Sequence, residues 1–155
     1  MAVHPVTGDL YILTKEAVYS QLRAEPARLY RVSAKAIAQA QESKALALEN
    51  VGLLDLPALL PGRTLFGQIA TSMDISADGE RLLVLTYELA VELPLARVGE
   101  PVAAWKEGKD FSVASGFPRG WQLEAIAYAA DGRSFYFDSE SRGASEAPVF
   151  RVDCR

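Results

Sequence analysis

Short apolar runs alternate with tight polar turns along the chain, and one arrangement of run and turn occurs three times. In each copy, a mostly apolar run of five residues follows a turn in which glycine lies beside aspartate or threonine; the runs are 10–14, 82–86 and 135–139. Glycine at these places supplies the positive φ angle that tight hairpin turns need. A second short run precedes each turn, at 1–3, 73–75 and 126–128. The pattern therefore predicts three β-hairpins.

A third run follows each hairpin and shows that a larger unit repeats. The run LYRV at 29–32 closely matches VFRV at 149–152, and AVEL at 90–93 lies between them. Segments 45–54 and 111–115 are candidates for a fourth strand. A four-stranded antiparallel unit repeated about an axis is a propeller blade. The sequence thus predicts an all-β, β-propeller-like fold with blades at 1–56, 68–117 and 122–155, which is about two and a half to three blades or half a propeller. A β-sandwich of three similar hairpins is the alternative.

The composition is that of one globular domain, and the distribution of charges argues against one class of partner. Half of the 155 residues are apolar, and charges that sum to −4 are spread along the chain without a basic stripe, which argues against nucleic-acid binding. No apolar run approaches the roughly 18 residues of a membrane span. The N-terminus has no charged segment followed by an apolar one, so no signal peptide is predicted in the chain as given. Cys154 is the only cysteine and can form no internal disulfide.

Three segments resemble a known group of proteins. The run TSMDISADGERLLVLTYE at 71–88 resembles the T-x-x-D-x-S-x-D-G-x-x-L-x-x-x-T-Y motif of uncharacterised bacterial β-propeller proteins, which are similar to the esterase-like-phytase and SdiA-regulated groups. The runs QLEAIAYAADGRSFYFDSES at 122–141 and HPVTGDLYILTKE at 4–16 resemble other blades of these proteins, although Leu123 stands where they usually have glycine. The resemblance implies a propeller fold but says little about activity, because propellers host many functions.

The resemblance also implies that the chain is half of a larger object. Similar proteins are rings of roughly six blades, twice the length of this chain, and a stable ring needs at least about four. Met1 falls inside the first strand of blade one, and Arg155 follows the third strand of blade three. We therefore expect either a homodimer that closes one ring, which is the preferred interpretation, or a missing N-terminal half. Proteins that the chain resembles are often exported, and the sequence itself predicts no cellular compartment.

Two groups of residues are candidates for binding. Glu124 begins the inner strand of blade three, where related propellers place a carboxylate that can bind Ca²⁺, and Asp74 lies in the inner strand of blade two. A calcium site needs about six to eight oxygens; the alternatives are a solvated rim carboxylate for Glu124 and a bond to neighbouring backbone for Asp74. Lys15, Tyr87 and Glu140 end the three second strands at equivalent positions. Together they could bind a zwitterionic or phosphate-bearing ligand, or they are three unrelated strand ends.

No catalytic set is complete in the sequence. His4 is the only histidine and lies beside a turn, so neither a Ser-His-Asp triad nor a zinc site is expected. P-loop, GxGxxG and GxSxG motifs are absent. The sequence therefore favours a non-enzymatic propeller domain that binds a partner or small ligand on one face or in its channel. A calcium-dependent phytase-, esterase- or lactonase-like hydrolase, completed by a second copy or a missing half, is the alternative.

Overall fold

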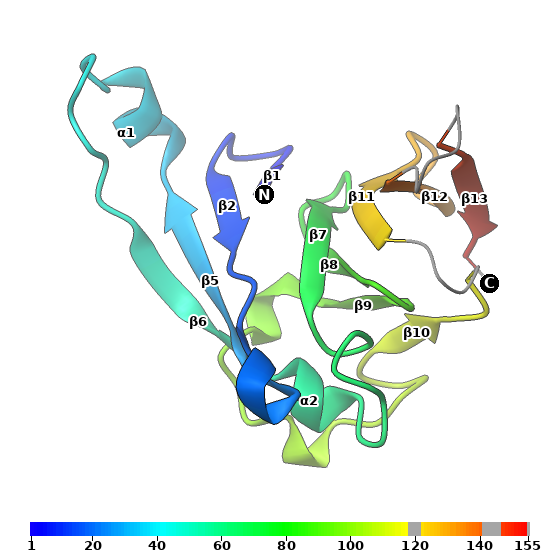
Figure 1. Ribbon diagram of the computed structural model, residues 1–155. Coiled ribbons are helices and arrows are strands. Elements are labelled where there is room, and N and C mark those ends of the chain that lie inside the picture. The colour runs from blue at the N-terminus through cyan, green and yellow to red at the C-terminus, as the bar shows by residue number, and fades with distance from the viewer. Residues whose placement is uncertain (118–121, 141–146, 155) are drawn as a thin grey trace.

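The computed structural model describes residues 1–117, 122–140 and 147–154. It consists of three antiparallel sheets, a small hairpin and a few short helices (Figure 1). The predicted all-β class, with antiparallel sheets built around the repeated hairpins, is confirmed, whereas closure into a propeller stays a prediction. The predicted third unit includes 141–146 and 155, which lie outside the described residues. No helix in the described part is long and apolar enough to cross a membrane.

Each repeated unit forms one sheet, and the strand order is the same in all three. Sheet 1 has the order β1 (Ala2–Val3), β2 (Leu10–Leu13), β5 (Ala27–Val32), β6 (Glu49–Leu54). Sheet 2 has the order β7 (Ala70–Ile75), β8 (Arg81–Thr86), β9 (Ala90–Pro94), β10 (Ser112–Ala114). Sheet 3 has the order β11 (Gln122–Tyr128), β12 (Ser134–Glu140), β13 (Val149–Asp153). Strands therefore form in both segments predicted to supply a fourth strand.

Short elements connect the strands and sheets. A hairpin of β3 (Ala17–Val18) and β4 (Arg23–Ala24), which the sequence pattern did not predict, lies between β2 and β5. The helices are α1 (Ala34–Ala38), α2 (Leu56–Leu59) and the 3₁₀ turns η1 (Tyr19–Gln21), η2 (Leu95–Arg97) and η3 (Val102–Ala104). Both α-helices begin at a capping side chain: the Ala36 N–H donates to Ser33 Oγ, and the Ala58 N–H donates to Asp55 Oδ1.

The three hairpin turns have the same hydrogen bonds at equivalent positions. The N–H groups of His4, Ser76 and Ala129 donate to the carbonyls of Asp9, Arg81 and Ser134, at 2.8, 3.0 and 2.8 Å. In every turn one side-chain oxygen accepts the N–H two residues further on; these acceptors are Thr7, Asp78 and Asp131. Such local side-chain bonds favour the turn over competing backbone conformations. The repeat is thus present in the geometry as well as in the sequence.

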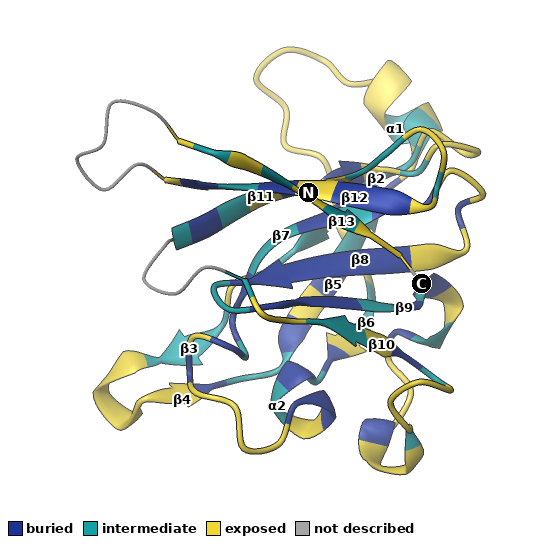
Figure 2. Ribbon diagram, turned by 90° about the vertical axis from the view of Figure 1, so that its right-hand side faces the viewer, coloured by how far each residue is buried: buried dark blue, intermediate teal, exposed yellow. Residues whose placement is uncertain are grey.

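The three sheets meet at their first strands and diverge from there. Strand β7 contacts β1 on one side and β11 on the other. Sheet 1 and sheet 3 extend from these strands in opposite directions, and sheet 2 lies between them (Figure 1). Strand β8 therefore runs through the middle of the molecule and is buried along almost its whole length (Figure 2).

The core consists of two joints between successive sheets. We call the face turned toward the preceding sheet the upstream face and the opposite one the downstream face. The upstream face of sheet 2 is at most 4% exposed and consists of Met73, Ile75, Leu82, Val84, Val91 and Leu93. It packs against the downstream face of sheet 1, which includes Ala2, Tyr11 and Leu29. The downstream face of sheet 2, with Leu83, Leu85 and Ala90, packs in turn against the upstream face of sheet 3, which consists of Ile126, Tyr128, Phe135, Phe137, Phe150 and Val152.

Candidate functional site

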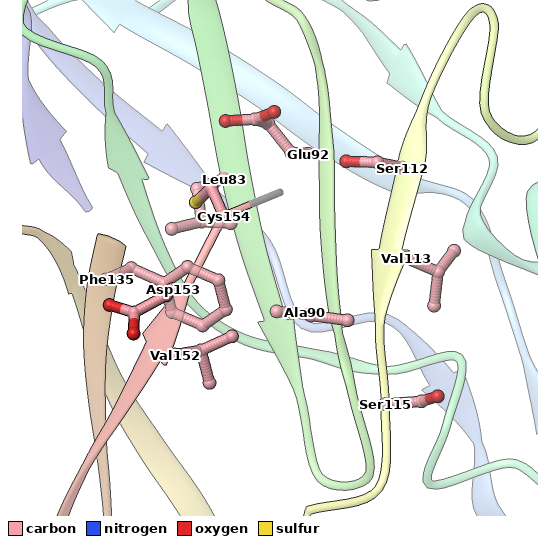
Figure 3. A pocket seen from close by; sticks show the side chains of 11 residues that line it. Leu83, Ala90, Glu92, Ser112, Val113, Ser115, Phe135, Val152, Asp153 and Cys154 are labelled. Atoms are coloured by element: carbon pink, nitrogen blue, oxygen red, sulfur yellow. The ribbon is translucent and has the colours of Figure 1, made fainter. Parts of the chain in front are cut away.

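A cavity of about 550 Å³ lies between sheet 2 and sheet 3 (Figure 3). Strands β8, β9 and β10 form one wall, and β12 and β13 form the other. The lining residues are Leu83, Ala90, Glu92, Ser112, Val113, Ala114, Ser115, Phe135, Val152, Asp153 and Cys154. Small-molecule sites in proteins measure about 300–1,000 Å³, so this cavity has the size of a ligand pocket.

The cavity has an apolar floor and a polar rim. Leu83, Ala90 and Phe135 are buried and form the floor. Glu92 and Ser112 lie directly opposite each other in the β9–β10 register, so both side chains project from the same face of sheet 2. Cys154 follows β13, and its N–H donates to the Arg133 carbonyl at 2.7 Å, which holds this residue against sheet 3.

The Glu92 carboxylate on the cavity rim contacts side chains of two sheets. Its Oε1 accepts a hydrogen bond of 2.6 Å from the Tyr128 hydroxyl, and its Oε2 lies 3.6 Å from an Arg81 guanidinium nitrogen. Burial, and then the bond to Glu92 and its charge, raise the pKa of Tyr128, so this hydroxyl stays a donor at physiological pH. Burial and the Glu92 charge likewise raise the pKa of the Cys154 thiol. The Glu92 carboxylate of sheet 2 therefore helps to raise the pKa values of Tyr128 and Cys154, which belong to the neighbouring sheet 3 unit.

Replacing Glu92 by glutamine is expected to make Cys154 more reactive near neutral pH. The substitution removes the negative charge that helps to raise the thiol pKa, so the thiolate fraction at a given pH increases. Because Cys154 is the only cysteine, the rate of reaction with Ellman's reagent reports on this residue alone. The midpoint of the pH–rate profile should move to lower pH in E92Q, while both proteins react alike well above their midpoints. E49Q, which removes an exposed carboxylate of sheet 1, is the matched control. Identical profiles for E92Q and the wild type would contradict the assignment.

The structure brings together two of the three strand-end residues. Lys15 Nζ donates to the Tyr87 hydroxyl and lies 4.5 Å from the centre of its ring. Phe66 packs edge-on against the same ring, with centroids 5.8 Å apart. Glu140 pairs with Gln122 in the β11–β12 register and forms neither an ion pair nor a hydrogen bond with Lys15 or Tyr87, all of which the structure describes. Lys15 and Tyr87 are therefore in contact, and ligand binding by these two residues together with Glu140 stays a prediction.

Glu124 lies on a β-bulge, and its charge acts on the Lys15 amine. The register of β11 shifts at this residue, and that of β7 shifts at the equivalent Thr71. Bulges of this kind re-aim side chains at the edge of a sheet. Burial lowers the pKa of Lys15, but the hydrogen bond from its amine to Tyr87 and the charges of Tyr87 and Glu124 outweigh this effect, so the pKa is raised. The pKa of Lys15 therefore depends on residues from two other sheets, Tyr87 after β8 and Glu124 in β11.

Asp74 connects two sheets. Its Oδ2 accepts a hydrogen bond of 2.8 Å from the Tyr128 backbone N–H, although the residues are 54 positions apart in the chain. Of the two roles considered from the sequence, this contact is the one expected of a residue that bonds to neighbouring backbone. The same Tyr128 donates from its hydroxyl to Glu92, so one tyrosine is tied to sheet 2 at both ends.

Clusters of metal-binding side chains, around Glu124 and Asp74 or elsewhere, bear on the predicted calcium site. Within residues 1–117, 122–140 and 147–154, no three or more His, Cys, Asp or Glu side chains are gathered so that they could hold a metal ion. Calcium binding by Glu124 and Asp74 therefore stays a prediction.

A scan against models of protein families finds none that matches this chain, and a search of curated proteins finds no relative.

The cavity residues were not among the sequence-predicted site residues. One available signal was Glu92, the only charged residue in the otherwise apolar strand Ala90–Pro94. A carboxylate in a strand that is buried on both faces needs a partner. The sequence offered no means of choosing Tyr128 and Arg81 as those partners, because both come from other strands.

Proposed function

We propose that this chain is part of a β-propeller, related to the propeller groups that its motifs resemble, and that it is a non-enzymatic binding domain. Three features support the architecture: the common strand order of the sheets, the contacts among their first strands, and the repeated joints in which each sheet covers the next. These are the features by which propeller blades pack about an axis.

The ligand proposed for this domain is a small, largely apolar molecule that carries one hydrogen-bonding group. The cavity between sheets 2 and 3 is the observation that carries this proposal. Its floor of Leu83, Ala90 and Phe135 suits an apolar body, and its rim offers Glu92 and Ser112 to a hydroxyl or amine. Pockets with an apolar lining and a few converging polar groups are typical small-molecule sites.

A simple alkanol tests this proposal because it has the same chemistry. Titration of the 16.8 kDa chain with 1-octanol, followed by amide NMR spectra, should shift the signals of residues around the cavity, such as Ser112, Val113 and Val152. The variant A90L fills the floor with a larger side chain, and S115W places a large ring at the exposed rim. Both variants should weaken or abolish these shifts.

The matched controls place the same side chains at exposed positions away from the cavity. A96L lies in η2 and S20W in η1, and both should bind 1-octanol like the wild type. Shifts that are absent from the cavity residues, or that persist unchanged in both A90L and S115W, would overturn the proposed site.

A further inference from the structure

Sheet 1 has an apolar upstream face that is partly open to solvent, most of all at its first strand. Its residues are Met1, Val3, Leu10, Ile12, Tyr30 and Val32, and they pair across the strands as Leu10 with Val32 and Ile12 with Tyr30. Met1 is 77% and Val3 60% exposed, and the others except Val32 are only partly buried. Contiguous apolar surface of this kind marks an interaction site.

The internal repeat shows what such a face packs against. The six residues occupy the positions that Met73, Ile75, Leu82, Val84, Val91 and Leu93 have in sheet 2, where the same strand pairs recur in the same register. In sheet 2 all six are buried by the downstream face of sheet 1. The equivalent residues of sheet 3 are packed in the same way against sheet 2. An upstream face in this fold is thus covered by a downstream face.

The chain also carries one downstream face that lacks a following sheet among the described residues. This face of sheet 3 consists of Ala127, Tyr136, Asp138, Val149 and Arg151, and Val149 is 69% exposed. The equivalent positions of sheet 2 include Leu83, Leu85 and Ala90, which cover sheet 3. Among the described residues, one molecule therefore presents both halves of a third joint, one on sheet 1 and the other on sheet 3 (Figure 1).

We propose that the occupant of the open face of sheet 1 is sheet 3 of a second copy of this chain. A contact between two different faces of one protein is head-to-tail, and it forms a closed assembly when the rotation brings the last copy back to the first. Since sheets 1 and 3 extend in opposite directions from the shared first strands (Figure 1), two copies can close through two identical joints. The product is a ring of two chains in which the two outer faces of each copy are buried.

The mass in solution is the first test. Light scattering coupled to size-exclusion chromatography should give twice the chain mass of 16.8 kDa. The variants V3D and V149D each place a charge at an exposed position in one half of the joint, so both should be folded and monomeric. L22D changes an equally exposed residue in the β3–β4 hairpin and should stay dimeric. Circular dichroism verifies that all three variants are folded.

Mixing the two monomeric variants tests the head-to-tail geometry. A V3D chain has an intact sheet 3 face and a V149D chain an intact sheet 1 face, so the mixture can form one undamaged joint. A mixed dimer, weaker than the wild type, is the expected result. A monomeric wild type, a dimer that survives both substitutions, or open assemblies larger than two copies would each overturn the proposal. The 1-octanol titration of V3D remains informative in every case, because the cavity lies in the joint between sheets 2 and 3 of the same chain.

Discussion

Replacing Phe137 by alanine is expected to reduce the free energy of unfolding by about 3–5 kcal/mol, the usual cost of truncating a large buried aromatic side chain. Phe137 lies in β12 and is only 3% exposed. Its ring stacks between Phe117, with centroids 4.2 Å apart, and Phe150, with centroids 5.0 Å apart. The small side chain would leave a void in the joint between sheets 2 and 3, and the rigid strands on both sides limit how far the void can close.

Urea unfolding followed by circular dichroism measures this loss. Small domains are stable by only about 5–15 kcal/mol, so F137A should shift the midpoint strongly and could leave part of the protein unfolded without urea. F66A removes the same side chain from a position that is 53% exposed and should cost much less. Equal losses for the two variants would show that the joint does not hold the fold together in the way described.

The repeated part of the fold could be predicted because its determinants are local. Glycine-containing turns fixed the hairpins, and the offsets of 72 and 53 residues between copies recur in the turn hydrogen bonds of His4, Ser76 and Ala129. The apolar runs also indicated which strands are buried in the core.

The β3–β4 hairpin escaped prediction because it lacks these local signals. Its strands have two residues each, and its turn has no glycine. Instead Leu22 adopts a left-handed conformation with a φ angle of 49°, which is uncommon for a residue with a branched apolar side chain. Contacts elsewhere therefore decide this conformation; Ala24 of the hairpin is buried with Leu65 and Ile69 of another loop.

The candidate site could be predicted only in part, because it depends on distances between sheets. The equivalence of Lys15 and Tyr87 correctly placed them at neighbouring strand ends, where they touch. The effect of the Glu124 charge on Lys15 depends instead on the bulge in β11 and on how sheet 3 packs. The cavity is likewise a gap left between β9–β10 and β13 as the sheets diverge. No pattern within one strand specifies the width of such a gap.

Asp74→Ala is the second substitution with a large expected effect, a loss of about 1–3 kcal/mol. The change removes the carboxylate that accepts the Tyr128 N–H and leaves a partly buried donor without its partner, which costs about this much. D74N retains an oxygen that can accept the same bond and should recover part of the loss. D153A, which removes a carboxylate that is 76% exposed, should change stability by less than about 0.5 kcal/mol, as exposed ion pairs usually do.

Hydrogen exchange at the Tyr128 amide separates a connecting role for Asp74 from a general loss of stability. If the carboxylate ties β11 to sheet 2, D74A should speed exchange at Tyr128 more than at the amides of β8, which remain in the centre of the fold. The Tyr128 hydroxyl would still donate to Glu92, so sheet 3 should loosen at its first strand rather than detach. A uniform increase in exchange over all sheets would instead place Asp74 among the residues that stabilise the whole chain, and would show that the two sheets do not open separately.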